Sequence, residues 1–212
     1  MRITVFGAAG SVGGRAVAEA LHRGHEVTAV VRNPKRFSEV PAGAIARVGD
    51  ASSVEDVVAL SAGQDVVISA TRPAPGRERD LVTTTKALMD GLRQTRVRLL
   101  LVGGAASLKV PGANRIVVDD PVLVPPALQA IAQACNEQLE ACRVESTVDW
   151  TYLSPPAVLE PGERTGRYRT GSDTLVVDPD GRSHLSVEDL AVALLDEVES
   201  PQHRRARFTV AS

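Results

Sequence analysis

The chain has 212 residues, a formal net charge of −2 and basic residues scattered along its length. This length is typical of one α/β domain, which can bury a core without disulfides or metals. The charge balance leaves no basic stripe for a nucleic acid. No apolar run reaches the ~18 residues that a membrane span needs. We expect a single domain over residues 1–212 that binds small molecules and exists as a monomer or homodimer.

The N-terminal segment and the two cysteines bear on the compartment. Met1–Phe6 leads directly into a strand pattern, without the apolar core of a signal peptide. Cys135 and Cys142 lie seven residues apart in one predicted helix, about 10 Å from each other, which is too far for a disulfide. These features predict a reduced, cytoplasmic protein.

Short apolar runs rich in Val, Ile and Leu alternate with segments of helical periodicity. The runs are typical of parallel strands covered on both faces. The predicted strands are Ile3–Phe6, Val27–Val31, Ala44–Val48, Val66–Ser69, Val97–Val102, Val148–Leu153 and a closing strand at Arg207–Val210. This alternation predicts a Rossmann-type α/β fold with a doubly wound parallel sheet and right-handed crossovers.

Capping residues mark several of the predicted helices. Asn33 precedes Pro34 at a first helical position, and Ser53 with Asp56 and Ser186 with Asp189 form capping-box pairs. The predicted helices are Ser11–Arg23, one from Pro34, one from Ser53, Leu81–Gln94, Pro126–Arg143 and Ser186–Glu199.

The last third of the chain is less regular. Prolines and glycines break the periodicity, and we expect a small substrate region over about residues 155–185 within the same domain. Leu175–Val177 and the turn Pro179–Gly181 predict a hairpin-like excursion. The Asp- and Pro-rich stretch 119–126 has two open interpretations, a lid or an interface.

A glycine turn follows the first strand and opens the first helix. The segment Gly7-Ala8-Ala9-Gly10-Ser11-Val12-Gly13 has the placement that a dinucleotide-binding turn requires. Its glycines permit the tight turn, the approach of the pyrophosphate and the packing of helix on strand. The helix N-terminus then presents free N–H groups to the phosphates. We therefore predict that Gly7, Ala9, Gly10, Ser11, Val12 and Gly13 bind a dinucleotide.

The G-x-x-G-x-x-G spacing and six later segments resemble one family. The segments are Val30-Val31-Arg32-Asn33-Pro34, Val48-Gly49-Asp50-Ala51, Val67-Ile68-Ser69-Ala70, Leu101–Leu108, Asp149–Pro156 and Ser186-Val187-Glu188-Asp189. Over nearly its whole length the chain resembles the atypical short-chain dehydrogenases/reductases that bind NAD(P)H and are often described as NADH-flavin reductases. They are relatives of the NmrA-like proteins and of the flavin/biliverdin reductase B type.

This resemblance implies further cofactor contacts. It places Asp50 at the adenine amino group with Ala51 beside the ring, and Ser69, Ala70 and Thr71 near the nicotinamide ribose. Asp50 has a second open interpretation, as a cap of the helix that starts near Ser53.

Arg32 stands where NAD-preferring Rossmann sites carry an acidic residue. A guanidinium pairs with a 2′-phosphate through two charge-assisted bonds, and Lys35 and Arg36 add positive charge nearby. We therefore predict a preference for NADP(H) over NAD(H), with Arg32 and Arg36 at the cofactor. The alternatives are solvated surface charges, or an Arg32 that stacks on adenine without discriminating.

Standard short-chain dehydrogenases use a Tyr with a Lys four residues on. Here the residues four after Tyr152 and Tyr168 are Pro156 and Ser172, so this dyad is absent. The remaining catalytic candidates are Ser107, for which a capping role is equally open, and Tyr152, which with Pro155 is expected to border the nicotinamide. Trp150 is expected in the core.

The arginines of one loop and the four histidines are less specific signals than these candidates. Arg72, Arg77 and Arg79 are either a clamp for an anionic substrate or part of a solvated loop. The four histidines lack the spacing of a metal site, and no metal is predicted.

Two functions from different classes fit these residues. The first is hydride transfer from NADPH to a flavin-like or quinone-like acceptor, which needs little help from a protein acid. The second is a redox sensor that binds NADP(H) without turnover. An isomerase or epimerase is disfavoured, because such enzymes usually need the same Tyr/Lys dyad.

Overall fold

An eight-stranded sheet forms the centre of the computed structural model, which describes residues 1–212. Its strand order is β3-β2-β1-β4-β5-β6-β10-β8. The strands are β1 (Arg2–Phe6), β2 (Glu26–Val31), β3 (Ile45–Val48), β4 (Val66–Ser69), β5 (Arg98–Val102), β6 (Trp150–Ser154), β8 (Arg169–Gly171) and β10 (Ala206–Ala211). All neighbours pair in parallel except β8, which runs antiparallel to β10. The predicted Rossmann-type sheet is therefore confirmed, and the strand order reverses next to β1.

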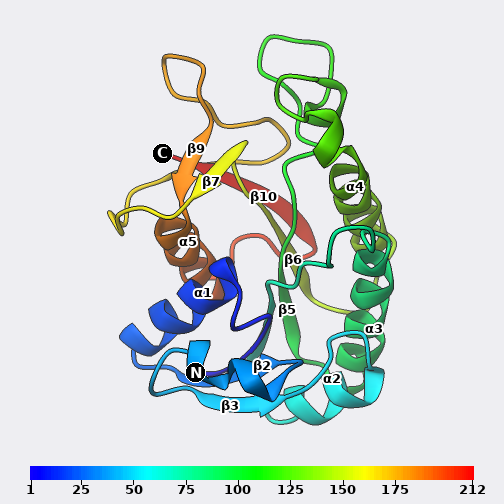
Figure 1. Cartoon of the computed structure of the whole chain (residues 1–212), viewed down its shortest axis with the longest axis vertical. Helices are drawn as coiled ribbons and strands as arrows, with labels where there is room; N and C mark the ends of the chain where they lie inside the picture. Colours follow the sequence, from blue (N-terminus) through cyan, green and yellow to red (C-terminus); the bar gives the residue numbers. More distant parts are fainter.

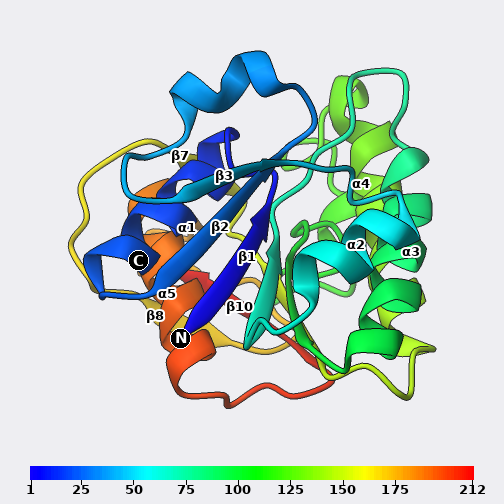
Figure 2. The same ribbon diagram turned by 90° about the horizontal axis from the view of Figure 1, so that it is seen from below.

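Helices cover both faces of the sheet (Figures 1 and 2). One face carries α1 (Ser11–His22) and α5 (Val187–Glu199), and the other carries α2 (Val54–Ser61), α3 (Asp80–Thr95) and α4 (Gln129–Arg143). Each face has its own core, since Ile3 and Leu194 belong to one buried cluster and Phe6 and Leu88 to the other. None of the helices is long and apolar enough to cross a bilayer.

In the two predicted capping boxes, Ser53 with Asp56 and Ser186 with Asp189, only the hydrogen bond to the serine forms. The hydroxyls of Ser53 and Ser186 accept hydrogen bonds from the amides of Asp56 (3.1 Å) and Asp189 (3.0 Å), as expected of N-caps. The two carboxylates do not return to the cap residue. Asp56 instead accepts from the Asp50 amide (2.8 Å), and Asp189 accepts from the Gly166 amide (2.7 Å). Each acidic residue therefore holds a neighbouring loop against its helix.

Two predicted helices differ in type or in start. The segment after Asn33 is a 3-10 helix over Pro34–Glu39, capped by the Asn33 side chain. The helix expected from Pro126 begins with a 3-10 turn at Pro126–Leu128, and α4 proper starts at Gln129. Adjacent prolines at positions 125 and 126 remove two amide donors and favour the tighter turn.

The prediction of a hairpin within residues 163–185 is wrong, because its two strands do not pair with each other. The turn exists, because the Gly181 amide donates to the Asp178 carbonyl at 2.9 Å, but Leu175–Val177 form no strand. Strand β7 (Val158–Glu160) instead pairs in parallel with β9 (His184–Ser186). Leu175 is instead buried in a small third cluster with Leu108 and four neighbours, and its amide donates to the Lys109 carbonyl at 2.9 Å.

Candidate functional site

The glycine turn connects β1 to α1 at the point where the strand order reverses. Gly7 has a φ of +82°, and a Cβ there would lie 2.6 Å from the Ala70 carbonyl oxygen. A Cβ on Gly13 would lie 2.1 Å from the Gly7 carbonyl oxygen. A Cβ on Gly10 would have one atom within 4 Å, the Gly7 carbonyl oxygen at 3.2 Å. Gly7 and Gly13 are thus needed for packing, whereas Gly10 leaves the space above the turn open.

The first turn of α1 provides free amides above this turn. The Gly14 amide bonds to the Gly10 carbonyl (2.8 Å), whereas the amides of Ser11, Val12 and Gly13 have no acceptor in the protein. Free N–H groups and the helix dipole together favour an anion at this position.

A cleft of about 820 Å³ opens above these amides, within the range of cofactor sites. It brings together most of the predicted cofactor-binding residues, namely Gly7, Ala9, Gly10, Ser11, Val12, Arg32, Arg36, Asp50, Ala51, Ala70 and Thr71. The glycine turn, the free amides and the cleft volume together fit a dinucleotide.

Some residues around the cleft differ from the prediction. Gly13 packs beneath the cleft, and Ser69 is buried with its hydroxyl 3.2 Å from that of Thr71. The lining also includes Leu81, Thr83 and Thr84 at the start of α3, which sequence reasoning missed. They follow an irregular loop, and no motif marks them.

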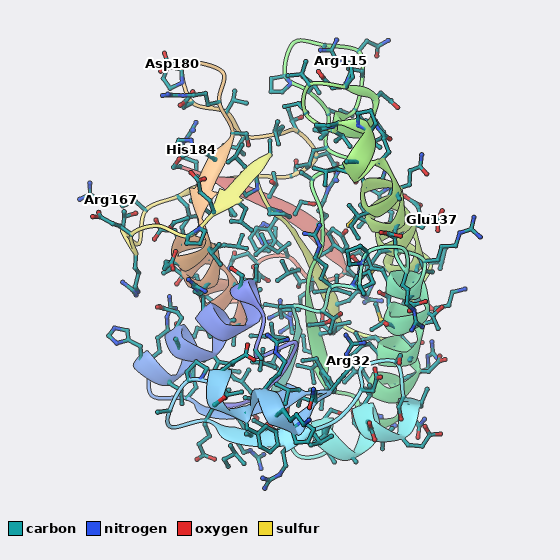
Figure 3. The ribbon with its side chains drawn as sticks, viewed as in Figure 1. Arg32, Arg115, Glu137, Arg167, Asp180 and His184 are labelled. Atoms are coloured by element: carbon teal, nitrogen blue, oxygen red, sulfur yellow. The ribbon has the colours of Figure 1, made fainter.

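Arg32 and Asp50 face the same part of the cleft. Arg32 is exposed and makes no ion pair, and it lies at the end of the molecule opposite to Arg115 and Asp180 (Figure 3). Asp50 accepts from the Ser52 amide (2.8 Å) and hydroxyl (2.7 Å). Burial opposes ionisation of Asp50, but these bonds and the charge of Arg32 lower its pKa below the usual value. Because Ser53 caps α2, the alternative helix-capping role of Asp50 is ruled out.

Arg36 spans the mouth of the cleft. Its guanidinium pairs with Glu39 at 2.6 Å and donates to the Ala9 carbonyl at 2.7 Å. Arg36 therefore contacts the glycine turn directly, but a carboxylate already neutralises part of its charge.

A second, apolar pocket of about 500 Å³ adjoins the cleft. The two share a boundary of six residues: Val12, Ala70, Thr71, Arg72, Pro73 and Leu81. The wall of the pocket includes Pro155 and Pro156 after β6 and the turn after β5. Leu123 and Val124 also line it, so part of the stretch 119–126 belongs to the wall of the pocket. Of the three loop arginines, only Arg72 lines both cavities.

The prediction that Tyr152 is catalytic is wrong. Its side chain is fully buried, and its hydroxyl donates to the Cys135 carbonyl (3.0 Å) and accepts from the Gly104 amide (3.1 Å). Burial raises its pKa well above the usual value. A Cβ on Gly103 would overlap the Tyr152 ring, so Gly103 leaves the room in which the ring packs. Tyr152 supports the turn after β5 and reaches neither cavity.

The prediction that Ser107 is catalytic is also wrong, and its hydroxyl does not cap a helix or turn either. Its hydroxyl accepts from Arg207 of β10 at 2.9 Å, and Arg207 also pairs with Asp173. Ser107 lines neither cavity. Trp150 lies in the core as expected, with its Nε1 donating to the Glu145 carbonyl at 3.3 Å.

Comparison with known proteins agrees with the cleft geometry. The sequence profile of a family described as NAD(P)H-binding matches residues 7–201. The chain belongs to this NAD(P)H-binding family. The assignment confirms the resemblance to the atypical reductases and shows that the chain belongs to an NAD(P)H-binding oxidoreductase family.

Three similar proteins cover essentially the whole chain. YwnB of Bacillus subtilis, whose activity is uncharacterised, is 37% identical over 100% of this chain and 99% of its own length. A Bacteroides thetaiotaomicron structure described as a "putative epimerase" is 39% identical with a TM-score of 0.89, covering 99% and 96% of the two chains. A Streptococcus pneumoniae structure described as a "putative NADH-flavin reductase" is 29% identical with a TM-score of 0.86, covering 100% and 99%.

Proposed function

We propose that this protein transfers a hydride from NADPH to a flat flavin-like or quinone-like acceptor. The observation that carries this proposal is the shared boundary between the nucleotide cleft and the apolar pocket. A dinucleotide that extends from Arg32 across the glycine turn would bring its nicotinamide to that boundary. The bound cofactor would supply the hydride, and the protein would position the two rings against each other.

The residues of the cleft have separate roles in this proposal. The amides of Ser11 and Val12 bind the pyrophosphate, and Arg32, assisted by Arg36, binds the 2′-phosphate. Asp50 accepts a hydrogen bond from the adenine amino group, and Ala51 lies beside the ring. Ser69, Ala70, Thr71 and Pro155 surround the nicotinamide end.

The lack of a lysine or tyrosine as proton donor at either cavity favours this type of acceptor. None of the three lysines lines either cavity, and Tyr152 is held in the core. Ketone reduction and epimerisation both require an acid or base beside the nicotinamide. Flavins and quinones accept a hydride without one, so they fit the site better.

A second candidate is a sensor that binds NADP(H) without turnover, which the same lack of an acid favours. For either function, the two free thiols agree with a cytoplasmic location.

The decisive experiment follows the loss of NADPH absorbance with FMN, riboflavin and quinones as acceptors. Fluorescence titration measures NADPH binding in parallel. Turnover of at least one acceptor is the expected result. Tight NADPH binding without turnover of any acceptor would reject the reductase and favour the sensor.

A further inference from the structure

The apolar pocket contains very little charge. Of its 23 lining residues 15 are hydrophobic, and Arg72 is the only charged one. A phosphate group needs several donors or cations when it leaves water. The phosphate of FMN would find one guanidinium, at the boundary with the cofactor, and none deeper in the pocket. The lining therefore favours an uncharged ring over a phosphorylated flavin.

Arg72 lies where the ring of an acceptor would meet the nicotinamide. It belongs to both cavities, is exposed and makes no ion pair, so its positive charge is available to a ligand. That charge reaches into the apolar pocket. Burial raises the pKa of the Cys135 thiol, which lines the pocket, to about 11, and Arg72 acts in the opposite direction.

The outer wall of the pocket is apolar up to its mouth. Leu123 and Val124 come from the stretch 119–126, and Ile131 comes from the first turn of α4. Leu128 also lines the pocket but remains 46% exposed. An apolar substituent on the acceptor would cover this side chain and gain hydrophobic free energy.

We propose that the acceptor is a neutral quinone with an apolar substituent, and that Arg72 stabilises the anion formed when the quinone is reduced. This inference rests on the proposed function. The hydride carries two electrons from the dihydronicotinamide to the quinone, which leaves NADP⁺ and a quinol monoanion. One quinone oxygen gains the hydrogen, and the other carries the negative charge beside Arg72. Water then supplies the proton that completes the neutral quinol.

The role of Arg72 is tested with Arg72→Met and Arg72→Lys, using Arg167→Met as the matched control. Arg167 is also exposed and without an ion pair, but it lies outside both cavities (Figure 3). We expect Arg72→Met to lower kcat for quinones about 10- to 100-fold, the range of one charge-assisted hydrogen bond. Lysine should restore part of the rate, and Arg167→Met should leave it unchanged. Fluorescence titration of NADPH separates this effect from weaker cofactor binding.

The apolar substituent is tested with two quinones that share a ring and differ only in an alkyl chain. Calorimetry measures their binding to the NADP⁺-loaded protein. Leu128→Glu should remove the affinity advantage of the alkylated quinone and leave the short one bound as before. Val122→Glu is the matched control, because Val122 lies six residues earlier, is 85% exposed and lines neither cavity.

Two outcomes would overturn the inference while leaving the proposed function intact. One is faster turnover of FMN than of riboflavin and of both quinones. The other is an Arg72→Met variant that loses only NADPH affinity and keeps the quinone kcat. Failure of every acceptor despite NADPH binding would reject the proposed function itself, and the inference with it.

Discussion

At the scale of single residues, the charges at the carboxyl end of β2 bear on which dinucleotide binds. Arg32 has no partner in the protein, whereas Arg36 shares Glu39 and the Ala9 carbonyl. An unpaired guanidinium in the cleft can bind a phosphate without losing another contact. A guanidinium that is already paired must first give up its carboxylate partner, so it gains less from the phosphate. We therefore assign most of the discrimination to Arg32.

Replacing Arg32 by Asp tests this assignment. The contact with a 2′-phosphate should contribute about 1.5 to 3 kcal/mol, or roughly one to two decades in affinity. Arg32→Asp should weaken NADPH binding by that factor and leave NADH binding equal or improved, because a carboxylate accepts from the free ribose hydroxyls. Titrations of both reduced cofactors at low and high salt give the measurement, and the preference for NADPH should shrink as salt rises.

Lys35→Asp is the matched control, since Lys35 lies three residues later, in the 3-10 helix, and does not line the cleft. It should change NADPH affinity far less. Equal affinity of the wild-type protein for NADH and NADPH would disprove the assignment.

Site residues could be predicted from the sequence where a local backbone feature, such as a turn or the end of a strand, determines their position. The glycine turn determines where the amides of Ser11–Gly13 lie, and the end of β2 determines where Arg32 lies. Tyr152 and Ser107 were not predictable, because their surroundings come from distant segments. Gly103 and Cys135 enclose the Tyr152 hydroxyl, and Arg207 binds Ser107 from a strand 100 residues later. A single sequence carries no signal for such contacts.

At the scale of elements, a buried carboxylate joins the C-terminal excursion to α1. Glu19 is 5% exposed and accepts from Arg23 of its own helix (2.8 Å) and from Arg164 (2.7 and 2.8 Å). Hydrogen bonds from Arg164 lower its pKa to about 2, with Arg23 adding to the effect and burial opposing it. The segment that follows β7 is thereby held against α1.

This ion pair makes part of the stability depend on pH. A carboxyl whose pKa is lowered by folding stabilises the protein fully above its unfolded value of about 4.5, and that contribution is lost as pH falls towards 2. Glu19→Gln should lower the free energy of unfolding by about 1 to 3 kcal/mol at pH 7. The difference from wild type should shrink between pH 4.5 and pH 2 in urea denaturation.

Glu137→Gln serves as the control, because Glu137 is exposed on α4 and points into solvent (Figure 3). It should change stability little at any pH. A Glu19→Gln variant with a constant deficit across this pH range would contradict the role of the ion pair.

Long elements were predicted well and short ones poorly. Strands β1, β2 and β4 to β6 are largely apolar and buried, because helices pack on both faces of the sheet there, whereas β3 lies at the edge and is mostly exposed. Strands β7, β8 and β9 have three residues each, too few to show a period. Their pairing is set by partners more than 20 residues away, as for β8 with β10.

At the scale of the whole molecule, cofactor binding should stabilise the fold. A ligand at 100 times its Kd adds about 2.7 kcal/mol of stability when it binds only the folded state. For a domain of this size, that corresponds to a rise in Tm of about 5 to 11 °C. Thermal unfolding with and without NADPH measures the shift.

Gly10→Val is the control for this measurement. A side chain at Gly10 meets only the Gly7 oxygen of the turn and projects into the cleft, so the variant should fold and show no shift. An equal shift in both proteins would place NADPH elsewhere on the molecule.

The position of β10 has a consequence for synthesis on the ribosome. β10 lies between β6 and β8, with Thr209 opposite both Ser154 and Gly171. The cleft proposed for the dinucleotide is lined by residues of β1, β2 and the loops that follow β1 to β4, together with the start of α3, and this part of the chain is translated early. The edge of β6, and with it the pocket wall that begins at Pro155, has no strand beside it until residues 206–211 emerge. We therefore expect a nascent chain to complete the proposed dinucleotide site before the proposed acceptor pocket.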